Sequence, residues 1–271
     1  MPKNNYIYYL LLALVIFMTV KNFIQLKRLS KEKKFTESYA KVLRGDENAL
    51  EAVKAYIENE KNLDYKNEAL LVEAYQEMVE GKDPYKAIDD IDFGAILTDQ
   101  KGFSQKKLEA HSDLFVWLDL VCAKARNLSM IDIIETLYDK VTKYDEYLNN
   151  RLEYLEFKSI CESLLEKKGD ELAYLKKILD GDYAGVSHDK RLIGLYKRIA
   201  SCFLTYAGET IDEFFENDLH TFAETAVGRH LLESLELFEK YKPDEETVEE
   251  PKEENLEVEE NKEEVKEEEN K

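Results

Sequence analysis

The sequence predicts an all-α protein, and three observations support this prediction. Only Pro84 lies between Pro2 and Pro243, and proline is the residue that helix interiors tolerate least. The glycines are few and fall between segments whose apolar residues recur with helical spacing. No stretch shows the sustained two-residue alternation that is typical of a half-buried strand.

The chain begins with an apolar segment. Residues 6–20 read YIYYLLLALVIFMTV and contain no charge, proline or glycine. A hydrocarbon core of about 30 Å needs about 20 helical residues. Extension to Leu26 supplies that length if Lys21 reaches back to the interface. We therefore expect residues 1–29 to hold one transmembrane helix and its basic flank, with Tyr6, Tyr8 and Tyr9 at the interface.

Two alternatives to this anchor are weaker. A cleaved signal peptide needs a basic start and a small-residue cleavage site, whereas KNFIQLKRL follows Val20. A buried core helix would need an equally apolar partner, and the rest of the chain has none. Six basic residues follow the segment and one precedes it, which predicts a cytoplasmic body at the cell membrane. These six are Lys21, Lys27, Arg28, Lys31, Lys33 and Lys34.

The net charge of −20 is concentrated at the C-terminus. Residues 242–271 hold 15 acidic residues and five lysines. The few apolar residues of this segment bury too little surface to offset the entropy lost on ordering. This acidic tail should therefore be disordered. The tail is either a solvated chain with no binding role or a binding site for basic partners. The acidic balance disfavours nucleic acid, because phosphate binding needs clustered Lys and Arg.

The body should span residues 30–241 as a series of helices. The expected helices are 30–43, one starting near residue 46, 63–80, a short helix after Pro84, 104–126, one after Ser129, 150–168, 171–179, 187–206, 211–215 and 220–241. The residues expected to face inward are Ala49, Leu50, Val53, Tyr56, Ile57, Leu70, Leu71, Ala74, Tyr75, Met78, Leu108, Leu114, Phe115, Leu118, Val121, Cys122, Ile133, Ile134, Leu137, Tyr138, Val141, Phe222, Val227, Leu231, Leu232, Leu235 and Phe238.

Several helix ends have recognisable capping signals. Asp83-Pro84 is typical of an N-cap followed by a first-turn proline. Ser129-x-x-Asp132 is similar to a capping box, and Ser187 is expected to cap the helix that runs to Tyr206. Gly45, Gly81 and Gly169 are expected to end helices.

Two parts of the body look alike. Residues 63–96 align by eye with residues 152–186, and Asp92-Phe93-Gly94 then matches Asp182-Tyr183-Ala184. The alignment predicts a duplication of about 46–126 and 130–207, closed by a cap at 208–241. A chance match of Leu-, Glu- and Lys-rich helices is the alternative. A real duplication would stack helix pairs into a solenoid.

The body resembles the tetratricopeptide-repeat family. Ala69-Leu70-Leu71 with Tyr75, Gly81 and Ala87-Ile88 is similar to that family's first-helix aromatics and second-helix alanine. The spacing departs from the family's 34-residue register, so no groove residue is transferred. The resemblance implies a helical scaffold that binds a protein or peptide.

No catalytic, cofactor-binding or metal-ligating residue is predicted. Asp92-Phe93-Gly94 spells the kinase triplet but lacks the other kinase motifs, and we interpret it as a helix stop. None of the four histidines (His111, His188, His220 and His230) has metal-site spacing. The three cysteines, Cys122, Cys161 and Cys202, are expected to be buried packing residues in a reducing compartment.

We therefore expect a single-pass, membrane-tethered α-solenoid that recruits a protein or peptide and is not an enzyme. An extracytoplasmic, chaperone-like repeat module associated with secretion or envelope assembly is the first alternative, and it requires the opposite orientation. A helical enzyme without a linear motif is the second alternative, and it requires a closed pocket lined by converging charges.

Overall fold

The computed structural model describes residues 18, 21, 41–46, 49–59, 63–94, 105–166, 171–188 and 190–243. Every regular element in these ranges is a helix, so the all-α prediction is confirmed. The helices are α2 (Ala49–Asn59), α3 (Leu63–Val79), α4 (Tyr85–Asp90), α6 (Gln105–Asn127), α7 (Ile131–Thr142), α8 (Asp145–Leu148), α9 (Leu152–Leu164), α10 (Glu171–Asp180), α11 (Ile193–Tyr206), α12 (Glu213–Ala223), α13 (Ala226–Ser234) and α14 (Phe238–Tyr241).

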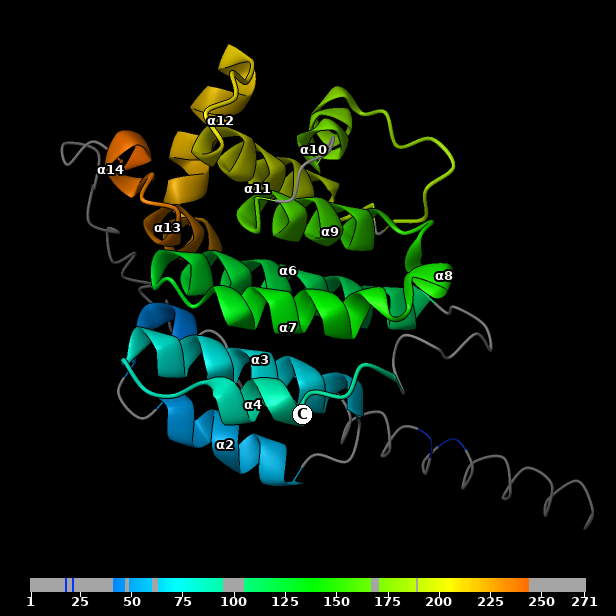
Figure 1. Cartoon of the computed structure of the whole chain (residues 1–271), viewed down its shortest axis with the longest axis vertical. Coiled ribbons are helices and arrows are strands. Elements are labelled where there is room, and N and C mark those ends of the chain that lie inside the picture. Colours follow the sequence, from blue (N-terminus) through cyan, green and yellow to red (C-terminus); the bar gives the residue numbers. More distant parts are fainter. Residues whose placement is uncertain are drawn as a thin grey trace, which may run out of the picture.

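The helices stack in layers along the long axis of the molecule (Figure 1). From one end the order is α2, then α3 with α4, then α6 with α7, then α9, then α10 with α11. The layer of α12 lies at the far end, and α13 packs between α12 and α6. Each helix therefore buries its apolar side on the layers above and below it.

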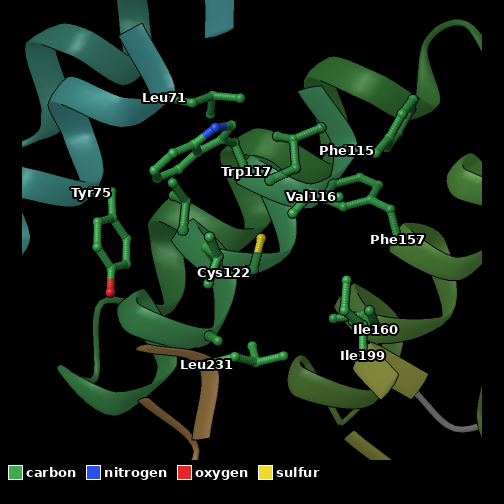
Figure 2. Packing of buried hydrophobic residues seen from close by; sticks show 14 of the residues in the cluster. Leu71, Tyr75, Phe115, Val116, Trp117, Cys122, Phe157, Ile160, Ile199 and Leu231 are labelled. Carbon is green, nitrogen blue, oxygen red and sulfur yellow. The ribbon is translucent and has the colours of Figure 1, made fainter. Parts of the chain in front are cut away.

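The central helix is α6, which contacts α3, α7, α9 and α13. Its residues 114–123 read LFVWLDLVCA, an apolar run broken by one aspartate, and all of them are buried. Trp117 packs edge-on to Tyr75 of α3 with ring centroids 5.9 Å apart. On the other side, Phe115 lies 5.8 Å from Phe157 of α9, and Figure 2 shows both clusters.

The inward faces agree with the sequence prediction wherever their side chains are described. Those residues are buried except for Ile57, Tyr138, Val227 and Phe238, which pack against the core while partly exposed. The side chains of Tyr56 and Leu108 lie outside the described residues. Amphipathic periodicity therefore located part of the core.

The end of α3 follows the predicted glycine signal, whereas the N-cap of α4 is Pro84 and not Asp83 as predicted. The Asp83 carboxylate accepts a hydrogen bond from the Tyr85 N–H at 3.0 Å, although the helix itself begins at Tyr85. Gly81 adopts φ +68°, and the Lys82 N–H then bonds to the Glu77 carbonyl at 2.7 Å. This left-handed ending satisfies carbonyls that the helix would otherwise leave free. Gly45 ends the turn at residues 41–44 with φ +71°.

The prediction of a capping box at Ser129 is wrong. Ser129 has φ +60° and ends α6, because the Met130 N–H bonds to the Ala125 carbonyl and the Ser129 N–H to the Arg126 carbonyl. These two bonds define a Schellman ending with serine at the position that glycine usually occupies. Asp132 instead accepts a hydrogen bond from the Tyr85 hydroxyl at 2.5 Å and so ties α7 to α4.

The prediction that Ser187 caps α11 is also wrong. Ser187 forms an isolated bridge with Arg151, in which its N–H donates to the Asn150 carbonyl and its carbonyl accepts from Leu152. The helix begins six residues later, at Ile193. The backbone of residue 187 is used for tertiary pairing with the start of α9, which leaves it unable to start a helix.

The single helix expected at 220–241 is three segments. Residues 220–223 end α12, α13 follows the Thr225 cap, and α14 follows Glu236 at φ +59°. The chain turns sharply because Gly228 packs directly on the backbone of Phe222, where a Cβ would lie 2.0 Å from the carbonyl oxygen. The helix expected at 211–215 likewise starts at Glu213 and runs to Ala223.

The helix expected at 150–168 ends earlier, at Leu164. Glu166 has φ +52°, and its N–H bonds to the Ser163 carbonyl. Gly169, which we expected to stop this helix, lies outside the described residues. The predicted start at Ser104 lies outside them too, and α6 is described from Gln105.

The apolar segment 6–26 and the acidic tail after Pro243 also lie outside the described residues, apart from residues 18 and 21. Among the helices that the structure describes, none is both long and apolar enough to span a bilayer. The duplication stays a prediction. Its first unit corresponds to α2, α3, α4 and α6, and its second to α7, α8, α9, α10 and α11.

Candidate functional site

The triplet Asp92-Phe93-Gly94 forms a helix end, as interpreted from the sequence. The Asp92 backbone exchanges two hydrogen bonds with the Asn67 side chain, at 2.8 and 3.1 Å. The Asp92 carboxylate accepts from the Gly94 N–H at 2.9 Å, and Phe93 is buried. Asp92 therefore links the end of α4 to Asn67 of α3, and its hydrogen bonds hold the fold together.

The described histidines lie apart from one another. His188 contacts the Val186 carbonyl at 2.9 Å through Nδ1, and Nε2 of His230 donates to the Leu43 carbonyl at 2.7 Å. The His220 ring packs on Tyr241 with centroids 5.2 Å apart, and the His111 side chain lies outside the described residues. Across the described ranges, no group of three His, Cys, Asp or Glu side chains is arranged to hold a metal ion.

One surface combines an exposed aromatic ring with uncompensated charge. Phe214 on α12 is 73% exposed, which is the largest value among the described apolar side chains. Its neighbour Phe215 faces inward, where Lys197 Nζ lies 5.6 Å above the ring. Asp212 and Glu213 precede Phe214, and both are exposed. We call Asp212, Glu213 and Phe214 the α12 surface.

The charges next to the α12 surface are mostly paired. Three carboxylates of this segment each form an ion pair with a lysine or arginine at 2.8 Å. These pairs are Glu209–Lys176, Glu216–Lys240 and Asp218–Arg198. Asp212 and Glu213 form no ion pair with any described residue. The α12 surface therefore presents two carboxylates and one aromatic ring to the solvent, at the end of the helix stack (Figure 1).

A second unusual feature is a buried carboxyl cluster. It comprises Asp119 on α6 with Glu153 and Glu156 on α9, and each is at most 1% exposed. Arg151, also buried, donates a hydrogen bond to Glu153. Both oxygens of Asp119 and of Glu156 are buried without a hydrogen-bond partner among the described residues. Such atoms are rare in folded proteins, because each one carries a desolvation cost.

The electrostatics of the cluster favour protonated side chains. Burial raises the pKa of Asp119 well above its ordinary value. Burial also raises the pKa of Glu156, and the nearby Asp119 and Glu153 carboxylates raise it further. Tyr174 of α10 has its pKa raised to about 12, first by burial and then by Glu156 and Glu153. α6, α9 and α10 therefore all contribute to one acidic centre.

Sequence reasoning missed both features. Asp119 stands inside the apolar run LFVWLDLVCA, and α9 carries apolar residues on all of its faces. A helix that is apolar all round is buried, so its charged residues must be buried too, and this signal could have located the cluster. No comparable signal separates Phe214 from the inward-facing Phe215.

Comparison with known proteins finds no match in family models, curated proteins or solved structures.

Proposed function

We propose that this chain is a membrane-tethered helical scaffold that recruits a partner protein through the α12 surface, and that it works by binding and not by catalysis. The partner segment is basic and carries an apolar side chain or pocket for Phe214. The tether is the apolar segment 6–26, and the basic residues that follow it favour a body on the cytoplasmic side of the cell membrane.

The observation that carries this proposal is the exposure of Phe214. An aromatic ring left in water costs free energy that an interface recovers, about 2 kcal/mol for one fully buried Phe side chain. Large aromatic side chains at the centre of an interface supply much of its binding energy. Phe214 packs edge-on to Phe215 with ring centroids 5.3 Å apart, and this contact still leaves most of its side chain in the solvent.

Charge complementarity selects the partner. Asp212 and Glu213 directly precede Phe214, and the chain as a whole carries a net charge of −20. A cationic segment is attracted to such a surface over long range, which raises its association rate. Lys or Arg side chains of the partner would pair with the two carboxylates and could stack on the ring.

The test places a photo-crosslinking amino acid at position 214 of the full chain in its native membrane, with the same amino acid at Val79 as control. Val79 is also exposed, at 46%, but lies on α3. We expect one protein to be captured at 214 and absent at 79, through a segment rich in Lys or Arg. Crosslinks equal at both positions would contradict the proposal.

A synthetic peptide of the captured segment then tests the chemistry by titration calorimetry. Phe214→Ala should weaken its binding roughly tenfold to thirtyfold, the equivalent of about 2 kcal/mol. Asp212→Asn with Glu213→Gln should weaken it less and should flatten its dependence on salt. Val79→Ala should leave the affinity unchanged. Equal affinity for Phe214→Ala and the natural chain would reject the α12 surface.

Two further variants test the remaining parts of the proposal. A chain that ends at Tyr241 should keep the partner, whereas loss of the partner would make the acidic tail the binding element.

Single cysteines in the tail test the orientation. Probed with an impermeant thiol reagent in intact cells, they should react only after the membrane is opened. Reaction in intact cells would favour the extracytoplasmic alternative.

A further inference from the structure

The buried carboxyl cluster lies where two parts of the stack meet. α6 and α9 run side by side in the same direction, since Phe115 packs on Phe157, Cys122 on Cys161, and Arg126 bonds Glu166 further along. Asp119 lies between the first two contacts on α6, and Glu156 lies beside Phe157 on α9. The cluster therefore belongs to the contact between the α6–α7 layer and the α9 layer (Figure 1).

The charges within the cluster do not balance when all its carboxyls are ionised. Three carboxylates would face one guanidinium, and Arg151 is already bonded to Glu153. Asp119 and Glu156 would then be two neighbouring like charges, and none of their four oxygens accepts a hydrogen bond from a described residue. Isolated buried charges of this kind are neutralised by protonation in preference to remaining charged.

Protonation also changes what these atoms can do. A carboxylate only accepts hydrogen bonds, whereas a neutral carboxyl group has one donor. A proton on Asp119 or Glu156 therefore lets one carboxyl donate to another, as in paired carboxyl groups that share a proton. The unpartnered oxygens are the structural sign that a proton belongs at this centre.

The groups around Glu156 come from several elements. α6 contributes Asp119, α9 contributes Glu153, the residue before α9 is Arg151, and α10 contributes the Tyr174 hydroxyl. α11 also packs on α9 and carries the buried Tyr196 hydroxyl. On α7, Tyr138 donates to Glu162 of α9 at 2.7 Å.

We propose that the buried carboxyl cluster is a proton-dependent latch, in which protons on Asp119 and Glu156 keep α9, with α10 packed against it, seated on α6 and their loss releases this contact. The latch is closed in mildly acidic and neutral conditions and opens as the pH rises. It is independent of the α12 surface, which shares no residue with it.

The direction follows from proton linkage. Burial holds the pKa of both carboxyls above the values of about 3.9 and 4.3 found in unfolded chains. Between those values and the raised ones, the closed state binds more protons than the open state, so closing weakens as pH rises. Each carboxyl changes the opening equilibrium by up to about tenfold per pH unit in that window.

The test measures amide hydrogen-exchange protection of α9 and α10 in the full chain, corrected for the intrinsic effect of pH, from about pH 5.5 to about pH 8.5. Protection should fall at least about tenfold in the natural chain. Asp119→Asn with Glu156→Gln should reduce that fall to less than about threefold, because two amides cannot titrate. The control is Glu135→Gln with Asp139→Asn on α7, where both residues are exposed, and it should keep the natural dependence.

A second readout locates the protons directly. The infrared spectrum of the folded natural chain at neutral pH should contain a protonated-carboxyl band that the Asp119→Asn, Glu156→Gln variant lacks and the α7 control retains. Absence of that band, or pH-independent protection in the natural chain, would overturn the latch, and neither result requires the variant to fold. A variant that folds and keeps the natural pH dependence would overturn it as well.

Discussion

The sulfur atoms of Cys122 and Cys161 lie 3.8 Å apart, both fully buried between α6 and α9. A disulfide needs about 2.05 Å, and the structure has all three cysteines as thiols. Cys202 is buried as well, and burial raises the pKa of its thiol. Because the thiolate is the reactive form, we expect none of the three to react with a thiol reagent while the chain is folded.

Mass spectrometry after brief labelling checks this expectation. All three cysteines should react once the chain is unfolded in denaturant. Asp212→Cys, which places a thiol on the exposed start of α12, should react at once in the folded chain and serves as the positive control. Rapid labelling of Cys122, Cys161 or Cys202 under native conditions would contradict the packing of the α6–α9 contact.

Among the described glycines, Gly228 should be the least tolerant of a side chain. A Cβ there would lie 2.0 Å from the Phe222 carbonyl oxygen and 2.8 Å from its ring. Gly228→Ala should lower the free energy of unfolding by about 3 kcal/mol, since the close approach of α12 and α13 must open. Gly194→Ala in α11 is the matched control, because nothing lies within 4 Å of its Cβ.

Urea denaturation of both variants separates the loss caused by the contact at Gly228 from the general effect of replacing a helical glycine with alanine. Gly194→Ala should be neutral or stabilise the chain by up to about 1 kcal/mol, through the higher helix propensity of alanine. Equal effects at the two positions would show that the turn between α12 and α13 does not depend on this contact.

This turn also shows where sequence prediction reaches its limit. The helices around Leu70, Phe115 and Ile133 were predictable, because each buries an apolar stripe whose spacing is visible in the sequence. The break between α12 and α13 was not, because Phe222, Val227 and Leu231 continue the same stripe across it. The break is made by the Thr225 cap, whose side chain accepts from the Gly228 N–H, and by the close approach of Gly228 to Phe222. A single threonine inside a continuous apolar stripe does not by itself predict such a break.

The wrong N-cap predictions at two serines have a related cause. Ser129 and Ser187 both have the residue type of an N-cap, yet one adopts a left-handed conformation to end α6 and the other pairs with Arg151. Side-chain type alone does not distinguish these uses of a serine. The candidate site was harder still, since whether Glu156 is buried or exposed depends on which helices cover α9.

Ser129 offers a gain in stability. Its φ of +60° is unfavourable for any residue with a Cβ, at a cost of roughly 1–2 kcal/mol. Ser129→Gly should therefore raise the free energy of unfolding by about 0.5–1 kcal/mol after the entropy of glycine in the unfolded chain is included. Ser129→Ala keeps the Cβ and should give no gain. Thermal denaturation of both variants tests this, and a gain from alanine would rule out backbone strain as the cause.

Lys140 ties α7 to the end of α4. Its Nζ donates to the carbonyls of Ile88, Asp89 and Ile91 at 2.8, 2.9 and 3.1 Å, where the helix dipole also favours a positive charge. Lys140→Met should cost about 1–2 kcal/mol and should loosen α4 selectively. Lys143→Met, at an exposed position three residues on, should cost less than about 0.5 kcal/mol.

Hydrogen exchange resolves the Lys140 effect by element. Amides of α4 should lose protection in Lys140→Met while those of α9 and α11 keep theirs, and Lys143→Met should resemble the natural chain. A uniform loss of protection would indicate a global effect in place of the local one expected here.

Tyr154 should control how the chain responds to acid. Its buried hydroxyl donates to the Asp145 carboxylate at 2.6 Å, and Lys158 lies 3.2 Å from the same oxygen. The pKa of Asp145 is lowered, first by the Tyr154 bond and then by Lys158. A lowered pKa stabilises the folded state above the ordinary aspartate value near 3.9, and this contribution disappears as pH falls through the folded-state pKa.

Tyr154→Phe should therefore cost about 1–2 kcal/mol at neutral pH, and the gap to the natural chain should narrow as the pH drops below about 3.9. Urea denaturation between neutral pH and about pH 3 measures the gap, and a carbon-detected NMR titration of Asp145 should show its pKa moving back up. Lys158→Met, which removes the more exposed donor, should move the pKa less. A gap that stays constant with pH would mean that Tyr154 acts through packing alone and that its hydroxyl does not set the charge state of Asp145.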